Sequence, residues 1–315
     1  GCYTRDAIRA TKLLKDAGFK IDFHLMPDLP GTTVETDKKM FDYVLHSQDL
    51  QADQWKIYPC QTVPWTVIEK WFKEGSYVPF KPEELMDVLV TVKSQVHPWI
   101  RLNRVIRDIP NEYIMGGNPV TNLRQMVLHT MRSKGLKCRC IRCRECKTNR
   151  GAEDAVMKKR VYKSSGGTEI FLSYESKDES LIYGFLRLRL TRPKRPAFPE
   201  LRDAALVREL HTYGQMRKVG DRRTGKIGKG NKAQHIGFGK RLMKKAEEIA
   251  RENNFSRVAV IAGIGTREYY KKRGYNLEGT YMVKDIGWST QSLLLHLLAA
   301  ALALVVALLL LPTVP

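Results

Sequence analysis

The chain has 315 residues, with 54 Lys and Arg against 33 Asp and Glu, which gives a net charge of +21. This length allows about two domains, and the positive excess favours a polyanionic partner, either nucleic acid or an anionic membrane surface. Four of the six cysteines lie within nine residues. That crowding does not fit a disulfide framework. Residues 1–18 also lack the layout of a signal peptide, so the cysteines indicate a metal site in a reducing compartment.

The first 110 residues alternate between helical and strand patterns. This alternation predicts βα units on a parallel sheet, and sites on such sheets lie beyond the carboxyl ends of the strands. The expected elements are helix 6–17, strand 20–26, helix 34–45, strand 54–58, helices 66–73 and 82–97, and strand 100–106. Side chains expected to line a cavity at that edge are His24, Met26, Asp28, Tyr58 and residues 104–108.

Residues 111–165 read as a connector that contains a short helix over 122–134 and then a cysteine cluster. The cluster is Cys138, Cys140, Cys143 and Cys146, and its C-x-C-x-x-C-x-x-C spacing suits zinc or an iron–sulfur cluster. We favour structural zinc, because the radical-SAM spacing C-x-x-x-C-x-x-C is absent. His129 or a more distant residue could replace one thiol. Basic residues between the cysteines would offset the negative charge of the thiolates.

A glycine-bearing turn, Gln234-His-Ile-Gly-Phe-Gly239, opens an amphipathic helix over 240–250. Unpaired N–H groups at such a helix start can bind a phosphate. Strands are expected at 205–213 and 258–262, on either side of this turn and helix, followed by a short helix that carries Tyr269 and Tyr270 and a last strand near 280–283. The Gly- and Lys-rich stretch 215–233 is expected to be a solvated loop, either inert or in contact with nucleic acid.

The stretch 292–311 contains twenty residues without a formal charge. As a helix it would span about 30 Å, the thickness of the hydrocarbon core of a bilayer. It predicts a C-terminal membrane anchor, and a buried apolar hairpin is the alternative. Such an anchor would place the protein in the mitochondrial outer membrane or the endoplasmic reticulum, with the catalytic part in the cytoplasm.

The order of strand, glycine turn, helix, buried strand and tyrosine pair resembles the GNAT acetyltransferases over residues 166–286. In that family an acyl-CoA lies between two splayed parallel strands, and a tyrosine near the thioester donates a proton. The resemblance implies Tyr269 and Tyr270 as catalytic residues. The residues it implies for contact with acetyl-CoA are Glu209, Leu210, His211, Thr212, Gln234, Gly237, Phe238, Gly239, Lys240 and Tyr270.

The chain up to about residue 286 resembles the catalytic subunit of Elongator. The matching segments are 15–20, 24–30, 56–59, 104–110, 138–143, 171–175, 208–214 and 234–239. The resemblance implies an α/β protein in four parts. These are the C-terminal part of a radical-SAM TIM-like barrel (1–110), a zinc-binding linker (111–165), a GNAT α+β domain (166–286) and a membrane anchor (287–315).

This resemblance also implies a function, the carboxymethylation of the wobble uridine, U34, of tRNA. The carbon donor would be acetyl-CoA and the radical would come from S-adenosylmethionine at a [4Fe–4S] cluster, whose ligands are expected upstream of Gly1. Implied partners are tRNA, other Elongator subunits, a second copy of the chain within the complex, and a membrane through the C-terminal helix. The alternative enzyme is a lysine acetyltransferase acting on histones or tubulin. A third possibility is a non-catalytic scaffold that binds tRNA.

Overall fold

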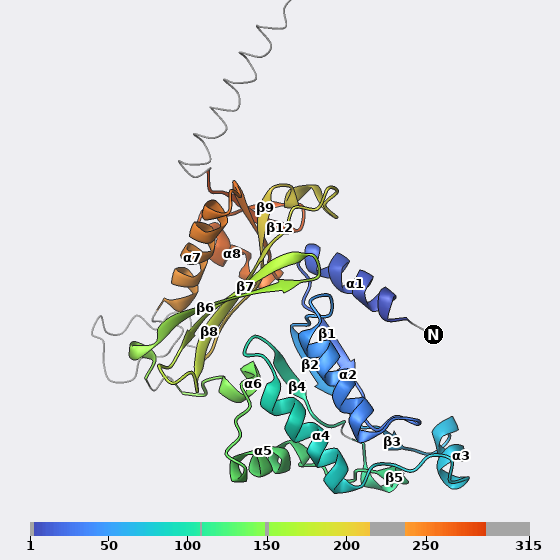
Figure 1. Cartoon of the computed structure of the whole chain (residues 1–315). Coiled ribbons are helices and arrows are strands. Elements are labelled where there is room, and N and C mark those ends of the chain that lie inside the picture. The colour runs from blue at the N-terminus through green and yellow to red at the C-terminus, as the bar shows by residue number, and fades with distance from the viewer. Residues whose placement is uncertain (1–2, 108, 149–150, 215–236, 288–315) are drawn as a thin grey trace, which may run out of the picture.

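A computed structural model describes residues 3–107, 109–148, 151–214 and 237–287. These residues form two sheets and a small two-stranded ribbon, arranged along the chain as Figure 1 shows. The sequence stretches 215–236 and 292–311 lie outside the described residues, and with them the expected loop, Gln234 and the expected anchor.

The N-terminal half is built on three parallel strands in the order β1-β2-β4. This confirms the parallel arrangement expected from the alternating pattern. Helix α4 begins with Pro82 at its first turn, and the Glu84 carboxylate accepts the N–H of Lys81, which caps the N-terminus. The elements are α1 (Thr4–Asp16), β1 (Asp22–Leu25), α2 (Val34–His46), β2 (Gln54–Ile57), α3 (Val67–Lys73), α4 (Pro82–Gln95) and β4 (Arg101–Arg104), with β3 (Gln61–Thr62) and β5 (Gly116–Gly117) forming the ribbon.

The connector contributes two helices, α5 (Leu123–Ser133) and α6 (Ile141–Arg144). Helix α5 buries Leu123, Val127 and Met131, which recur at four-residue spacing and pack into the same core as Trp55 and Leu89. The connector therefore shares its core with the three-stranded half.

The C-terminal half is a seven-stranded sheet in the order β11-β12-β10-β9-β8-β7-β6. Its elements are β6 (Val156–Ser164), β7 (Gly167–Glu175), β8 (Ile182–Leu190), β9 (Ala204–Thr212), α7 (Phe238–Glu252), β10 (Arg257–Ile261), α8 (Arg267–Lys271), β11 (Asn276–Glu278) and β12 (Tyr281–Asp285). Short 3-10 turns occur at Asn111–Tyr113, Ala152–Asp154, Pro199–Leu201 and Ile264–Thr266.

Helix α7 covers one face of this sheet (Figure 1). Its apolar stripe of Phe238, Leu242, Met243, Ala246 and Ile249 is buried, as the 3.6-residue period requires. The opposite face receives the N-terminal half: the Tyr281 hydroxyl donates to the carbonyl of Ala17 at 2.8 Å, and Lys15 reaches Ser164 of β6 at 2.8 Å. Strand β8 is thus buried on both faces.

Two sequence expectations need correction here. Residues 156–164, assigned to the connector because of their Lys and Arg content, form β6, paired with β7 along its whole length. A membrane anchor is also not supported, because no helix in the described ranges is long and apolar enough to cross a bilayer. The longest described helix, α7, has 15 residues, fewer than the roughly 20 that a span needs.

Candidate functional site

Strands β9 and β10 stop pairing before β9 ends, and we call the space beside the unpaired residues 208–212 the opening. Their parallel pairing runs from Ala204 to Val207, opposite residues 257–260. Within the described part of the chain, the last residues of β9, 208–212, have no strand partner on that side, whereas β8 continues along their other edge. The backbone of this segment therefore presents polar groups to the opening, as the two splayed strands of the GNAT resemblance would.

A β-bulge decides which side chains of β9 face this opening. The register with β8 shifts between Arg187 and Leu188, so Arg208 and Glu209 both face the N-terminal half. The Glu209 carboxylate accepts from Arg187 at 2.9 Å and from Lys20 at 3.2 Å. Leu210 instead packs with the α7 cluster. The four predicted contact residues of β9 are thus split between the two faces.

His211 belongs to the face that carries Glu209. Its ring lies 4.5 Å from that of Tyr213 and 5.9 Å from that of Phe185. Burial lowers the pKa of His211 below its usual value, with the neighbouring Arg101 and Lys20 charges acting in the same direction. The imidazole is therefore neutral at physiological pH.

The start of α7 closes the opening from the other side. Gly237 has φ +76°, the left-handed region that favours glycine, and Phe238 is buried against Tyr174. A Cβ on Gly239 would lie 2.7 Å from the Tyr269 hydroxyl oxygen and 3.9 Å from Cγ2 of Thr212. A side chain at 239 would therefore force the Tyr269 hydroxyl to move, at the point where β9, α7 and α8 converge. Lys240 follows on the exposed side of the helix.

The two tyrosines of α8 have different surroundings. Tyr270 is buried against Tyr275, and burial raises its pKa to about 12. The hydroxyl oxygen of Tyr269 is buried beside Gly239 without a hydrogen-bond partner among the described residues. Burial also raises the pKa of Tyr269, against the lowering effect of the Arg273 guanidinium, whose Cζ lies 3.3 Å from the centre of the Tyr269 ring. Both phenols are protonated at neutral pH, and Tyr269 is the one next to Gly239 and Thr212.

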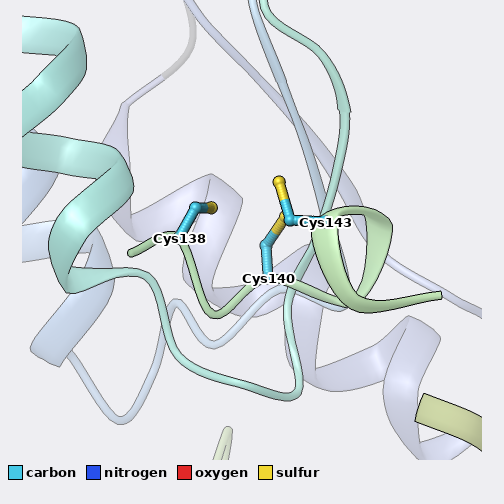
Figure 2. A group of neighbouring side chains, drawn as sticks. All are labelled: Cys138, Cys140 and Cys143. Atoms are coloured by element: carbon cyan, nitrogen blue, oxygen red, sulfur yellow. The ribbon is translucent and has the colours of Figure 1, made fainter. Parts of the chain in front are cut away.

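Three of the four clustered cysteines come together. The sulfur atoms of Cys138, Cys140 and Cys143 all lie within 4.8 Å of one another (Figure 2). The buried Lys93 ammonium is 3.6 Å from Sγ of Cys138 and 3.9 Å from Sγ of Cys143. This set of three soft donors with adjacent positive charge has the chemistry of a zinc-thiolate site. His129 is exposed and lies outside the group.

Cys146 is placed elsewhere. Its N–H donates to the carbonyl of Ile182, and its side chain belongs to the core under α7. A fourth thiol from the same short run cannot fold back to the other three while its backbone is bonded to β8.

The strand-end residues of the N-terminal half are only partly grouped. The rings of His24 and Tyr58 meet edge to face at 5.6 Å, and Lys56 lies 3.2 Å from His24 Nε2. Asp28 is buried away from them, and its carboxylate accepts the N–H of Phe80. Arg107 lines a separate cavity of about 260 Å³. Met26 is 40 % exposed, Arg104 is exposed at the end of β4, and residue 108 lies outside the described residues.

Sequence reasoning missed a buried network of charges between the two halves. Asp53, at the start of β2, accepts from Arg208 at 2.5 and 2.9 Å and lies 3.7 Å from Lys15. Glu169 of β7 pairs with both Arg208 and Arg189. Asp16 and Glu209 complete the network as partners of Arg189 and Arg187. Arginines at buried strand positions in the run Leu186-Arg-Leu-Arg-Leu190 were the available signal, because buried charges must be paired.

Comparison with known proteins identifies a matching domain and close relatives of this chain. A sequence model of the Radical_SAM C-terminal domain matches residues 52–133. The tRNA uridine(34) acetyltransferase of Methanocaldococcus infernus is 41 % identical over 295 residues, covering 91 % of this chain and 54 % of that protein. Elongator complex protein 3 of Homo sapiens is 38 % identical over 282 residues, covering 86 % of this chain and 50 % of that protein.

A solved structure agrees with these relatives. The archaeal Methanocaldococcus infernus Elp3 with an N-terminal deletion superposes with a TM-score of 0.81 at 40 % identity, covering 90 % of this chain and 67 % of that one. The chain spans about half the length of the curated relatives it matches.

The predicted membrane localisation is contradicted. The relatives carry the names of tRNA-modifying enzymes and Elongator subunits, with no membrane protein among those names, and the described residues contain no helix that could span a bilayer. The prediction depended on the 292–311 stretch, for which apolar length was the sole argument. By identity, coverage and fold, the chain belongs to the family of the tRNA uridine(34) acetyltransferases and Elongator complex protein 3.

Proposed function

We propose that this chain takes part in the carboxymethylation of U34 in tRNA and that its opening between β9 and α7 binds acetyl-CoA, the carbon donor. The observation that carries the proposal is the buried, unpartnered Tyr269 hydroxyl beside Gly239 and Thr212, at the end of an unpaired strand edge. A buried hydroxyl without a partner is costly in a protein interior, so a ligand that supplies one is expected there.

The opening fits an acyl-CoA in three respects. The edge of β9 offers backbone groups to a pantetheine amide, in the manner of an added strand. The start of α7, with glycine at 237 and 239, presents N–H groups to a pyrophosphate. Among the described residues, no heavy atom lies within 4 Å of a Cβ built on Gly237, which leaves room for a phosphate to approach the backbone. These features support residues 166–286 as a GNAT-type domain.

The proposed roles of the side chains follow from their placement. Tyr269, protonated and next to the opening, would donate a proton to the thiolate of coenzyme A as the thioester is cleaved. Tyr270 would support it from the core, since the two rings meet edge to face at 5.1 Å. The carbonyl edge of Leu210 and Thr212 would orient the ligand, while Glu209 and His211 face the N-terminal half.

The radical-SAM family implies S-adenosylmethionine and a [4Fe–4S] cluster, which would supply the radical needed to form a carbon–carbon bond on uridine. Among the described residues, the cysteine group is the one set of three close ligands of the His, Cys, Asp and Glu types. Its C-x-C-x-x-C spacing differs from the radical-SAM spacing, so we assign it to zinc and derive no step through the iron–sulfur cluster from this chain.

Zinc at Cys138, Cys140 and Cys143 is testable by metal content. The Cys140→Ser variant should lose the metal, because this thiol is fully buried within the group. The Cys146→Ser variant should keep it. Elemental analysis of the purified proteins measures both, and equal zinc loss in the two variants would contradict the three-thiol site.

The reaction is tested with carbon-labelled acetyl-CoA. The full-length protein, which would include the cluster ligands expected upstream of Gly1, is reconstituted with iron and sulfide and supplied with S-adenosylmethionine. It should transfer label to tRNA as carboxymethyluridine, detected by mass spectrometry of nucleosides. Label that accumulates on protein lysines, with tRNA having no effect on turnover, would instead support the lysine acetyltransferase alternative. Binding of tRNA and of other Elongator subunits is part of the same proposal.

A further inference from the structure

A cavity of about 970 Å³ lies between α5, the cysteine segment and the turn that joins β7 to β8. It is separate from the opening at β9 and α7, with which it shares no lining residue. Eight basic and three acidic side chains line it. The lining of the cavity therefore carries a strongly positive charge.

The three acidic side chains of the cavity already have ion-pair or hydrogen-bond partners. Glu145 accepts from Arg101 at 2.7 Å and from Arg142 at 2.6 Å. Glu179 pairs with Lys158 at 3.1 Å and with Arg160 at 2.9 Å. Asp178 accepts hydrogen bonds from the hydroxyls of its own turn. These carboxylates therefore do little to neutralise the remaining cations.

Four exposed basic side chains have no carboxylate partner in the described part of the chain, and the half-buried Arg124 contacts the Leu102 carbonyl and Cys143 Sγ. The four exposed ones are Arg132 at the end of α5, Lys137 and Lys147 in the cysteine segment, and Lys177 in the β7–β8 turn. Arg132, Lys137 and Lys147 lie within sixteen residues of one another, and the fold brings Lys177, thirty residues further along the chain, to the same cavity. Their convergence is a property of the fold and is not a simple charge run.

The cysteine group organises this wall of the cavity. The thiols of Cys138, Cys140 and Cys143 turn toward one another (Figure 2), and Cys140 is fully buried. Between them, the side chains of Arg139 and Arg142 are 56 % and 48 % exposed. The cysteine segment thus has its thiols grouped on the buried side and arginine side chains on the exposed side.

We propose that this cavity binds the phosphodiester backbone of RNA. The inference rests on the proposed function, and it names where the tRNA would be held. Exposed, unpaired Lys and Arg side chains are the usual contacts of phosphate groups. Lysine is depleted in protein–protein interfaces, so an acidic protein fits less well. The volume of this cavity is larger than that of one phosphate group, so it could hold several consecutive phosphates of an RNA strand.

The test compares two triple variants of the full chain. The cavity variant carries Lys137→Ala, Lys147→Ala and Lys177→Ala. The matched control carries Lys39→Ala, Lys70→Ala and Lys81→Ala, three exposed lysines that do not line the cavity and whose loss changes the net charge equally. The probe is a fluorescent tRNA transcript, titrated at several salt concentrations. Thermal melting and acetyl-CoA binding report whether each variant is folded.

The cavity variant should bind tRNA roughly 10- to 100-fold more weakly at low salt. The slope of log K against log salt concentration should also be shallower by about 2 to 3, because each phosphate contact contributes about 0.9 to that slope. The control should match the wild type. If the two triple variants bind tRNA alike while both still bind acetyl-CoA, and the full-length protein still modifies tRNA, the inference fails and the proposed function stands. If the wild-type chain binds no tRNA, both fail. If poly-glutamate competes with tRNA at equal charge, an acidic protein is the partner instead.

Discussion

The interface between the two halves and the cavity beside the cysteine loop are both rich in Lys and Arg, but burial gives these residues opposite roles. At the interface, four cations meet four anions: Lys15, Arg187, Arg189 and Arg208 against Asp16, Asp53, Glu169 and Glu209. In the cavity, eight basic side chains meet three acidic ones. A charged side chain that is buried away from water must be paired with an opposite charge, whereas an exposed one is solvated and needs no partner within the protein. Part of the +21 excess is therefore concentrated where solvent reaches it.

The largest effect should come from removing an anion at the interface. In Asp53→Asn, the Arg208 guanidinium and Lys15 ammonium lose their shared carboxylate while they stay fully buried. Breaking a buried pair in this way costs about 3 to 5 kcal/mol. Urea denaturation measures the free energy of unfolding. The control is Asp87→Asn, which breaks the exposed pair with Lys38 and should cost less than about 1 kcal/mol. Equal costs for the two variants would contradict the comparison.

A pH-dependent effect should come from Lys15. Burial lowers the pKa of Lys15 from 10.5 to about 8, against the raising effect of Asp53 and Glu169. Because the folded-state pKa is the lower one, this residue contributes most above the unfolded value and the contribution is lost as pH falls from about 10.5 to about 8. The difference approaches about 3 kcal/mol at its largest, from about 1.4 kcal/mol per pKa unit.

The measurement is the stability of the wild type minus that of Lys15→Met between pH 8 and 10.5. Other titrating groups are common to both proteins and cancel. The difference should rise with pH across this range. A flat difference would mean that Lys15 stays charged in the folded protein, as its two carboxylate neighbours would favour.

The smallest effect should come from the cavity. Lys177 is exposed in the β7–β8 turn and has no carboxylate partner in the described ranges, so Lys177→Ala should change stability by less than about 0.5 kcal/mol. The same change should reduce the salt dependence of tRNA binding by about 0.9 units. A thermal melt and a salt titration check both, and a destabilisation above about 1 kcal/mol would show that this lysine is structural.

Much of the fold follows from local pattern. The parallel strands β1, β2 and β4 and the helices α4 and α7 occur close to where hydrophobic periodicity, an early proline and the glycine turn predict them. Strand β6 was missed because four of its nine residues are Lys or Arg, three of them consecutive at 158–160, which hides the period-2 alternation of a strand at the sheet edge. The arginines of β8 signalled that buried carboxylates must exist but did not identify them, because Asp16 and Asp53 lie more than 130 residues away along the chain.

The site was predictable in composition and less so in geometry. The glycine turn, the tyrosine pair and the cysteine run were visible as residues. Spacing alone could not show that a bulge turns Glu209 away from the opening, that Tyr269 rather than Tyr270 lies beside Gly239, or that Cys146 is held by β8. Each of these depends on a contact with a residue far along the chain.

The claim on which the account depends is that acetyl-CoA binds where β9, α7 and Tyr269 meet, and isothermal titration of Gly239→Ala tests it. The added Cβ would lie 2.7 Å from the Tyr269 hydroxyl oxygen, so affinity for acetyl-CoA should fall by roughly tenfold or more, about 1.4 kcal/mol. Tyr269→Phe alone should also bind more weakly, because it lacks the hydroxyl that the ligand would pair with. In the double variant Gly239→Ala, Tyr269→Phe the clashing oxygen is absent, so this variant should bind no more weakly than Tyr269→Phe alone. Unchanged binding by Gly239→Ala, or a double variant that loses a further tenfold relative to Tyr269→Phe, would contradict the site.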